Sequence, residues 1–126
     1  MTVHPSRLKS ILVVDDEPAV ARLACDILED AGFDVRCAYD AYSGMQALEQ
    51  GEVDLLFTDI VMPRVDGFKF ADMATSRRPR LKVLYTTAYI GLAQELAAAG
   101  EVHGRILDKP YRPGELVHAI EEALEA

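Results

Sequence analysis

The sequence SILVVDDE, residues 10–17, is a short apolar run that ends in three acidic residues. Four consecutive Ile, Leu and Val side chains are typical of a β-strand buried on both of its faces. Because the acids follow without a spacer, this strand is expected to carry Asp15 and Asp16 to its carboxyl end. The rest of the chain can be interpreted from this arrangement of a buried strand followed by clustered charge.

Similar apolar runs recur along the chain and alternate with stretches that have apolar residues at helical spacing. Strands are expected at residues 10–14, 34–38, 53–58, 81–86 and 105–107, and helices at residues 19–28, 41–50, 68–77, 93–99 and 113–126. Gly32 and Gly51 end the first two helices, and Pro113 opens the last. Gly91 and Gly100 bracket the short fourth helix. The pattern predicts an α/β fold, a doubly wound five-stranded parallel sheet with five helices in a flavodoxin-like (βα)5 sandwich.

The length and the charge of the chain limit the number of its domains and the kinds of partner that it can bind. Its 126 residues fit one domain, expected at residues 10–126 behind a short polar N-terminal tail at residues 1–9. The net charge of −8 argues against direct nucleic-acid binding and against docking on anionic membranes. The N-terminus lacks the apolar region of a signal peptide, and no apolar run is long enough to span a bilayer. We therefore expect a cytoplasmic protein.

The cysteines and histidines show no spacing typical of a metal site. Cys25 and Cys37 belong to no CxxC motif or Cys/His cluster, so we expect two small buried thiols in a reducing compartment. His4, His103 and His118 are scattered along the chain, and no histidine metal site is expected.

In a doubly wound sheet, ligands bind outside the carboxyl ends of the strands, where the strand order reverses. The residues expected at those ends are Asp15, Asp16 and Glu17 after the first strand, Asp59 after the third, Thr87 after the fourth, and Lys109 followed by Pro110 after the fifth. Clustered carboxylates repel one another unless a cation neutralises them, and Mg²⁺ prefers such oxygen ligands together with phosphate. This rim is therefore a candidate Mg²⁺ and phosphoryl site. Pro110 also marks a candidate cis peptide bond.

Each side chain on this rim suits phosphoryl chemistry. An acyl phosphate on Asp59 would add oxygens to a metal shell, Thr87 could donate a hydrogen bond to the phosphoryl group, and Lys109 would offset its negative charge. Phosphoryl transfer needs mainly positioning and charge stabilisation, which this set supplies. Taken singly, these residues have simpler explanations, since an Asp pair after a strand is often a solvated turn or a helix N-cap. Their occurrence at the ends of different strands favours the phosphoryl site.

These residues resemble the receiver domain of two-component response regulators, over about residues 10–124. The resemblance lies in the motifs ILVVDDE at residues 11–17, TDIVMP at 58–63, DG at 66–67, TA at 87–88 and KPY at 109–111. It implies that Asp59 takes a phosphoryl group from a phosphohistidine on a sensor histidine kinase or a phosphotransfer protein. It further implies a bound Mg²⁺, or Mn²⁺, with Asp16 as a direct ligand, Asp15 acting through water, and the backbone carbonyl of Val61 completing the protein's share of ligands.

The resemblance also implies a route from the site to a partner. Thr87 would turn toward the phosphoryl group and Lys109 would pair with it, which would change an output surface at about residues 93–126. That surface, formed in this family by the fourth helix, fifth strand and fifth helix, would bind a downstream protein or a second copy of the chain. Many receivers carry Tyr or Phe three residues before the lysine, where this chain has Ile106, so aromatic-switch coupling in its usual form is not expected. Tyr89 is an alternative mobile aromatic, unless it only packs on the rim.

Two other functions share parts of this pattern. A hydrolase with an aspartyl-phosphate intermediate usually carries a second acid two residues after its nucleophile, and Val61 stands there, so we expect a regulatory phosphoacceptor rather than an enzyme. A pure interaction module would have lost the phosphorylation residues, which are all present here. The chain is either a stand-alone receiver or part of a larger protein such as a hybrid kinase, and its sequence names neither the kinase nor the stimulus.

Overall fold

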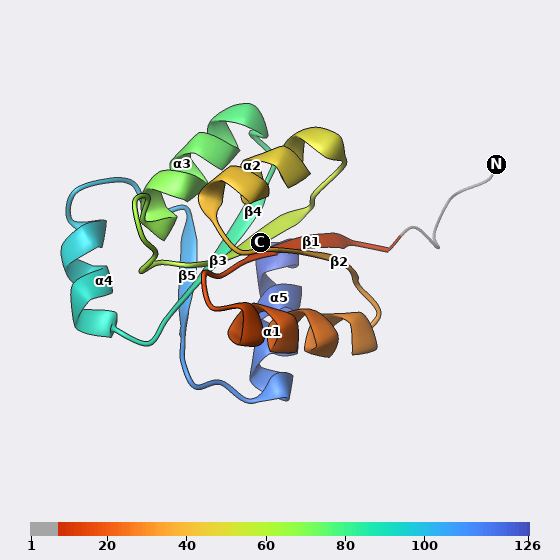
Figure 1. Ribbon diagram of the computed structural model, residues 1–126. Coiled ribbons are helices and arrows are strands. Elements are labelled where there is room, and N and C mark those ends of the chain that lie inside the picture. Colours follow the sequence, from red (N-terminus) through yellow and green to blue (C-terminus); the bar gives the residue numbers. More distant parts are fainter. Residues whose placement is uncertain (1–7) are drawn as a thin grey trace.

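The computed structural model describes residues 8–126, so most of the expected N-terminal tail lies outside the described residues. Within them, strands and helices alternate along the chain (Figure 1). The strands are β1 (Ser10–Val14), β2 (Asp34–Ala38), β3 (Leu55–Asp59), β4 (Lys82–Thr87) and β5 (Gly104–Asp108). The helices are α1 (Pro18–Asp30), α2 (Ala41–Gln50), α3 (Gly67–Arg77), α4 (Ile90–Ala97) and α5 (Pro113–Glu125). Every expected element is present, and the predicted fold class is confirmed.

The strands form one parallel sheet in the order β2-β1-β3-β4-β5. Since β1 pairs with both β2 and β3, the strand order reverses beside β1. Such a reversal opens a crevice at the carboxyl ends of the flanking strands. Figure 1 shows α1 and α5 on one face of the sheet and α2, α3 and α4 on the other. The edge formed by the ends of β1, β3 and β5 is therefore where the expected site must be sought.

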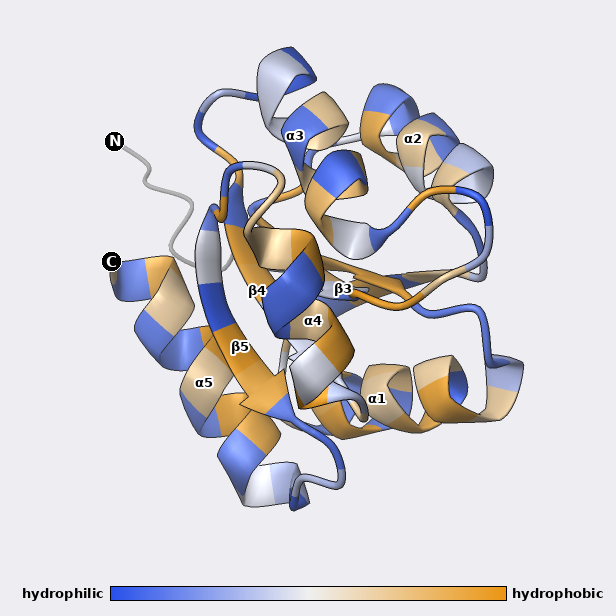
Figure 2. Ribbon diagram, turned by 90° about the vertical axis from the view of Figure 1, so that its left-hand side faces the viewer, coloured by the Kyte–Doolittle hydropathy of each residue, from blue (hydrophilic) through white to orange (hydrophobic). Residues whose placement is uncertain are grey.

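The sheet separates two hydrophobic layers. Leu12 and Val14 of β1 pack with α2, α3 and α4, whereas Ile11 and Val13 pack with α1 and α5. All four side chains are at most 1% exposed, which explains why the strand is apolar at every one of these positions. In Figure 2 the strands are mainly hydrophobic, whereas the helices carry both hydrophobic and hydrophilic residues. Between residues 8 and 126, no helix combines the length and the apolar character needed to cross a membrane.

Helix α4 begins about one turn earlier than predicted, at Ile90. The N–H of Tyr89 donates a 2.9 Å hydrogen bond to Oγ1 of Thr87, so the chain turns directly after β4. Gly91 therefore lies in the first turn of the helix and does not precede it. The predicted bracketing by two glycines is wrong at this end, because a side-chain hydrogen bond, and not a glycine, starts the turn.

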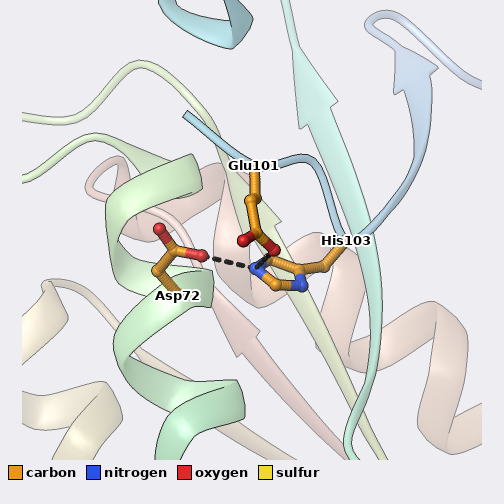
Figure 3. A group of neighbouring side chains, drawn as sticks. All are labelled: Asp72, Glu101 and His103. Atoms are coloured by element: carbon orange, nitrogen blue, oxygen red, sulfur yellow. Dashed lines mark hydrogen bonds and ion pairs between the residues drawn. The ribbon is translucent and has the colours of Figure 1, made fainter. Parts of the chain in front are cut away.

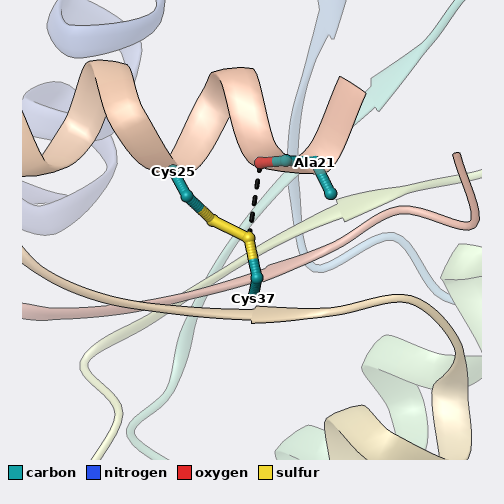
Figure 4. Close-up of a disulfide and its surroundings, with 3 residues drawn as sticks. All are labelled: Ala21, Cys25 and Cys37. Atoms are coloured by element: carbon teal, nitrogen blue, oxygen red, sulfur yellow. Dashed lines mark hydrogen bonds between the residues drawn. A yellow bond between two sulfur atoms is a disulfide. The ribbon is translucent and has the colours of Figure 1, made fainter. Parts of the chain in front are cut away.

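Cys25 and Cys37 form a disulfide between α1 and β2 (Figure 4). Their Cα atoms are 6.5 Å apart, and Sγ of Cys37 also lies 3.4 Å from the carbonyl oxygen of Ala21 in α1. The predicted pair of free thiols is therefore wrong. The two cysteines are 12 residues apart and belong to different elements, so only the packing of α1 on β2 brings them together. No spacing in the sequence encodes that contact.

Candidate functional site

Four charged side chains meet at the carboxyl edge of the sheet. Asp15 and Asp16 directly follow β1, Asp59 is the last residue of β3, and Lys109 directly follows β5. The parallel register pairs Val14 with Thr58, so β1 and β3 end side by side. We call the group of Asp15, Asp16, Asp59 and Lys109 the acid pocket. The sequence predicted that these residues converge, and the structure brings them together.

The acid pocket is a tight arrangement of ion pairs. One oxygen from each of the three aspartates lies within 4.8 Å of the other two. Nζ of Lys109 lies 2.8 Å from Oδ2 of Asp15 and 3.4 Å from Oδ2 of Asp59, so the lysine bridges both carboxylates. Asp15 and Asp59 are only 3% and 5% exposed. Water therefore screens their mutual repulsion poorly, and Lys109 offsets it directly.

Burial of Asp59, reinforced by the neighbouring charge of Asp15, raises the pKa of the Asp59 carboxyl to about 6. The charge of Lys109 and its hydrogen bond act in the opposite direction and do not cancel this rise. Burial lowers the pKa of Lys109, but its hydrogen bond to Asp15 and the charges of Asp59 and Asp15 outweigh burial, so the net shift of this pKa is upward. Both shifts thus combine the effect of burial with the contact of two carboxylates, Asp15 and Asp59, with one ammonium group.

The donor atoms of the acid pocket fit a hard divalent cation. Three carboxylates within 4.8 Å of one another offer only oxygen ligands, which Mg²⁺ prefers. Both carboxylate oxygens of Asp15 accept short hydrogen bonds, from the N–H of Glu17 at 3.0 Å and from Nζ of Lys109 at 2.8 Å. The two hydrogen bonds that Asp59 accepts are longer, at 3.4 Å each. Asp16 and Asp59 line an open cavity of about 430 Å³. These two carboxylates are therefore the better placed to coordinate an ion directly.

The loop after β3 forms one wall of that cavity through Val61, Met62 and Pro63, and Tyr89 lines the cavity as well. The N–H of Val61 donates a 3.4 Å hydrogen bond to Oδ1 of Asp59, so the backbone at this position reaches the acid pocket. A role for the Val61 carbonyl as a metal ligand stays a prediction. The side chain of Val61 offers no group that could transfer a proton beside Asp59.

Gly67 explains how the loop after β3 is held against the acid pocket. Its N–H donates a 2.7 Å hydrogen bond to the carbonyl oxygen of Ile60. A Cβ atom at this position would lie 2.2 Å from the carbonyl oxygen of Asp59, so only glycine permits the approach. Asp66 caps α3 by accepting a 3.0 Å hydrogen bond from the N–H of Lys69. The Asp-Gly motif therefore has a structural explanation.

Two further predicted residues, Thr87 and Pro110, also lie at this edge of the sheet. Thr87 ends β4 and is 1% exposed. Its hydroxyl oxygen accepts the N–H of Tyr89 at 2.9 Å, and within residues 8–126 no hydrogen bond joins it to Asp59. The side chain of Tyr89 is 63% exposed. The peptide bond between Lys109 and Pro110 is cis, which confirms the expectation from the sequence.

The aromatic ring that is missing at Ile106 occurs on the neighbouring strand. Ile106 pairs with Tyr85 of β4, and paired residues of parallel strands point to the same face. Tyr85 is fully buried, its ring centroid lies 4.7 Å from that of Phe68, and its hydroxyl accepts the N–H of His103 at 3.1 Å. Burial raises the pKa of Tyr85 to about 12, so the phenol stays neutral. Tyr85 was not singled out from the sequence as a functional residue. Its place in a predicted buried strand, two residues before Thr87, could have indicated that its ring lies near the site.

Comparison with known proteins points to response regulators. The profile of the response regulator receiver domain matches residues 11–121. The chain is 33% identical over 119 residues to the response regulator receiver protein CpdR of Brucella abortus (strain 2308), and this match covers 94% of the chain and 99% of CpdR. Other curated relatives are longer, and the chain covers only 24–26% of several of them.

Solved structures of receiver proteins superpose on nearly the whole chain. A response regulator receiver domain protein from Clostridium thermocellum does so with a TM-score of 0.83 at 27% identity, over 94% of this chain and 95% of that one. The response regulator protein TrrA from Thermotoga maritima, solved in complex with Mg²⁺ and BeF, gives a TM-score of 0.79 at 26% identity, over 92% and 99% of the two chains.

Proposed function

The chain belongs to the response regulator receiver domain family, and we propose that Asp59 is its phosphoacceptor. It is thus a regulatory receiver domain of the two-component type. Asp59 is suited to this role by its position at the end of β3, where it is paired with Lys109 on one side and lines an open cavity on the other. The cavity gives a phosphoryl donor access from solvent, while the buried side holds the carboxylate in place.

In the proposed transfer, an oxygen of the ionised Asp59 carboxylate attacks the phosphorus of a phosphohistidine on a sensor histidine kinase or a phosphotransfer protein. An O–P bond forms, the P–N bond breaks, and the donor imidazole keeps the electron pair of the broken bond. Nζ of Lys109, 3.4 Å from Asp59, stabilises the negative charge that arrives with the phosphoryl group. Asp15 keeps Lys109 in place through their 2.8 Å ion pair.

Mg²⁺, or Mn²⁺ in its place, would be held by Asp16 and Asp59, with Asp15 acting through water and the carbonyl of Val61 as a further ligand. Such an ion supplies the positive charge that clustered carboxylates and a phosphoryl group need at close range. Two observations support this assignment. The acid pocket offers oxygen donors within 4.8 Å of one another, and the similar protein TrrA was solved with Mg²⁺.

We further propose that Thr87 transmits phosphorylation to an output surface. Its side chain would turn so that the hydroxyl donates to a phosphoryl oxygen, and this rotation would break the hydrogen bond that the hydroxyl oxygen now accepts from the N–H of Tyr89. The turn into α4 would then move, and the exposed ring of Tyr89 would follow it. Helix α4 carries Ile90 and Leu92, which are 44% and 42% exposed. Exposed apolar side chains of this kind suit a protein partner, either a downstream protein or a second copy of the chain bound through α4, β5 and α5.

Turnover of an external substrate is not expected of this site. Val61 occupies the position at which aspartyl-phosphate hydrolases usually carry their general acid/base, so we propose that the domain acts only on its own phosphoryl group. A phosphatase assay with a generic phosphate ester should show no turnover. Turnover that Asp59→Asn abolishes would contradict this proposal.

Incubation with acetyl phosphate and Mg²⁺ tests the assignment of the phosphoacceptor by intact-mass spectrometry. The wild type should gain one phosphoryl group, and Asp59→Asn should not. Asp108→Asn is the matched control, because Asp108 is an exposed aspartate at the same edge of the sheet, and this variant should be labelled like the wild type. The three proteins are also compared with a phosphorylated sensor kinase as donor. Equal labelling of the wild type and Asp59→Asn with either donor would refute the assignment.

A further inference from the structure

Asp72, Glu101 and His103 form a second group of ligand-type side chains, outside the acid pocket (Figure 3). Asp72 lies in α3, and Glu101 and His103 lie between α4 and β5. One donor atom of each residue lies within 4.8 Å of the other two. Nε2 of His103 is 2.5 Å from Oδ1 of Asp72 and 4.0 Å from Oε2 of Glu101. We call these three residues the acid–histidine cluster.

The backbone that carries the imidazole of the acid–histidine cluster is anchored to the core. The backbone N–H of His103 donates to the hydroxyl of the fully buried Tyr85 at 3.1 Å. The side chain of His103 is 22% exposed, so part of the ring remains accessible from solvent. The side chains of Asp72 and Glu101 are 48% and 82% exposed, so both carboxylates can adjust to an ion. The cluster thus combines one mostly buried nitrogen donor on an anchored backbone with two more exposed oxygen donors.

The donor set of the acid–histidine cluster differs in kind from that of the acid pocket. One imidazole nitrogen with two carboxylate oxygens is a set that binds zinc and related ions, whereas Mg²⁺ prefers oxygen ligands alone. We propose that the acid–histidine cluster binds a divalent transition-metal ion of the zinc class, with a fourth position left for water. This inference does not depend on phosphorylation of Asp59.

The distances accommodate an ion after small side-chain movements. Ligand atoms about 2.1 Å from a tetrahedral ion lie about 3.4 Å from one another. Oδ1 of Asp72 would therefore move away from Nε2 of His103 by about 1 Å, and Oε2 of Glu101 would approach it by a smaller distance. Both movements need only rotation of partly exposed carboxylate side chains. The backbone of His103 can keep its hydrogen bond to Tyr85 throughout.

The same residues also have a simpler state, a direct ion pair between His103 and Asp72 with Glu101 in solvent. That state requires a proton on Nε2 of His103, whereas metal binding requires the lone pair of this nitrogen. The ion pair also makes Glu101 dispensable, while the metal site uses it as a ligand. The contribution of Glu101 therefore separates the two states.

A bound ion would connect segments that meet beside the proposed output surface. Asp72 belongs to α3, and His103 directly precedes β5 and is hydrogen-bonded to Tyr85 of β4. The ion would fasten the connection between α4 and β5 to α3. Bound metal should therefore reduce movement of the connection between α4 and β5. The domain would then have a second ligand site, separate from the acid pocket around Asp59.

Titration of the untagged, chelator-treated protein with Zn²⁺ tests the proposal by NMR of the imidazole nitrogens, in excess Mg²⁺ to occupy the acid pocket. The Nε2 resonance of His103 should change and saturate near stoichiometric Zn²⁺, before the resonances of His118 respond. His118 is a suitable internal control, because its side chain is 72% exposed and its Nε2 lies 3.5 Å from a carboxylate oxygen of Glu122. The acid pocket contains no imidazole, so Zn²⁺ bound there leaves these signals unchanged.

Variants of the two carboxylates complete the test. Glu101→Gln and Asp72→Asn should each weaken Zn²⁺ binding by more than about tenfold, because loss of even an outer partner of a zinc ligand costs that much. Glu122→Gln, the matched exchange beside His118, should leave the affinity unchanged. A Zn²⁺ affinity that survives Glu101→Gln would show that Glu101 is not a ligand and would overturn the proposal. A His103 resonance that shifts only together with that of His118 would also overturn it, because it would report weak binding to surface imidazoles.

Discussion

The acid pocket and the acid–histidine cluster both gather charged side chains from segments far apart in the sequence, yet they differ in burial. In the acid pocket, Asp15 and Asp59 are 3% and 5% exposed. In the cluster, the side chains of His103 and Glu101 are 22% and 82% exposed. Burial, and not the number of charges, therefore decides how strongly a charged group is coupled to the stability of the fold.

The physical reason is the dielectric response around each group. Repulsion between Asp15 and Asp59 acts inside the protein, where water screens it poorly and Lys109 must offset it. The carboxylates of the acid–histidine cluster are 48% exposed at Asp72 and 82% exposed at Glu101, so water screens their charges if a partner is lost. Changes in the acid pocket should therefore alter the free energy of unfolding by several kcal/mol, and changes in the cluster by less than about 1 kcal/mol.

Removal of Lys109 should have the largest effect. Lys109→Met leaves Asp15 and Asp59 buried without their counter-charge, and should lower the free energy of unfolding at neutral pH by about 4 kcal/mol. Urea unfolding in the presence of a chelator measures the loss, and added Mg²⁺ should restore part of it. Lys69→Met, at an exposed position of α3, should change stability by less than about 0.5 kcal/mol. Equal losses of stability in the two variants would contradict the claim that burial increases the contribution of a charge to stability.

Gly67→Ala should disturb the acid pocket through the backbone of Asp59. The new Cβ atom would lie 2.2 Å from the carbonyl oxygen of Asp59, so the backbone must shift, at a cost of about 3 kcal/mol in the free energy of unfolding. Gly91→Ala is the control, because no atom lies within 4 Å of a Cβ there and alanine favours the helix. Thermal unfolding of both variants should show a loss only for Gly67→Ala. A stable Gly67→Ala protein would show that the loop after β3 is not tightly held.

Asp59→Asn should stabilise the protein at neutral pH in the absence of divalent cations, by about 2 kcal/mol. The pKa of Asp59 is about 6 in the folded protein, above the ordinary value of 3.8, so ionisation costs more in the folded than in the unfolded state. The wild type therefore has its full stability from this group below about pH 4 and loses it as the pH rises through about 6.

Urea unfolding of both proteins across this pH range checks that prediction. The advantage of Asp59→Asn should be absent below about pH 4 and complete above about pH 7. Asp108→Asn, at an exposed position, should show no comparable pH dependence. A stability difference between the wild type and Asp59→Asn that does not vary with pH would contradict the raised pKa.

Asp72→Asn should have the smallest effect. Without metal it should lower the free energy of unfolding by less than about 1 kcal/mol, because the Asp72 side chain is 48% exposed and water screens its contact with His103. High salt should remove most of this difference. Zn²⁺ should enlarge it, since the wild type alone gains stability from tight binding. Urea unfolding in the presence of a chelator or of Zn²⁺ measures these differences. A loss of several kcal/mol in the free energy of unfolding with the chelator would mean that the cluster is coupled to stability as strongly as the acid pocket.

The acid pocket was predictable because each of its residues adjoins a strand that the sequence marks clearly. Apolar runs locate the strand ends, and right-handed crossovers bring those ends to one edge of a parallel sheet. Asp15, Asp59 and Lys109 follow from this rule. The acid–histidine cluster does not, because Asp72 and His103 are 31 residues apart in a helix and a connecting segment whose packing no local pattern specifies. The disulfide between α1 and β2 escaped prediction for the same reason.

Local patterns in the chain were enough to predict the alternation of strands and helices, the edge of the sheet that carries the site, and the residues proposed for phosphoryl transfer. These follow from local periodicity and from the regular geometry of parallel sheets. Four features became visible only in the folded protein: the bridge from Lys109 to two carboxylates, the raised pKa of Asp59, the place of Tyr85 beside Ile106, and the acid–histidine cluster. Each of these depends on burial and on contacts between distant segments, and such contacts exist only once the helices have packed on the sheet.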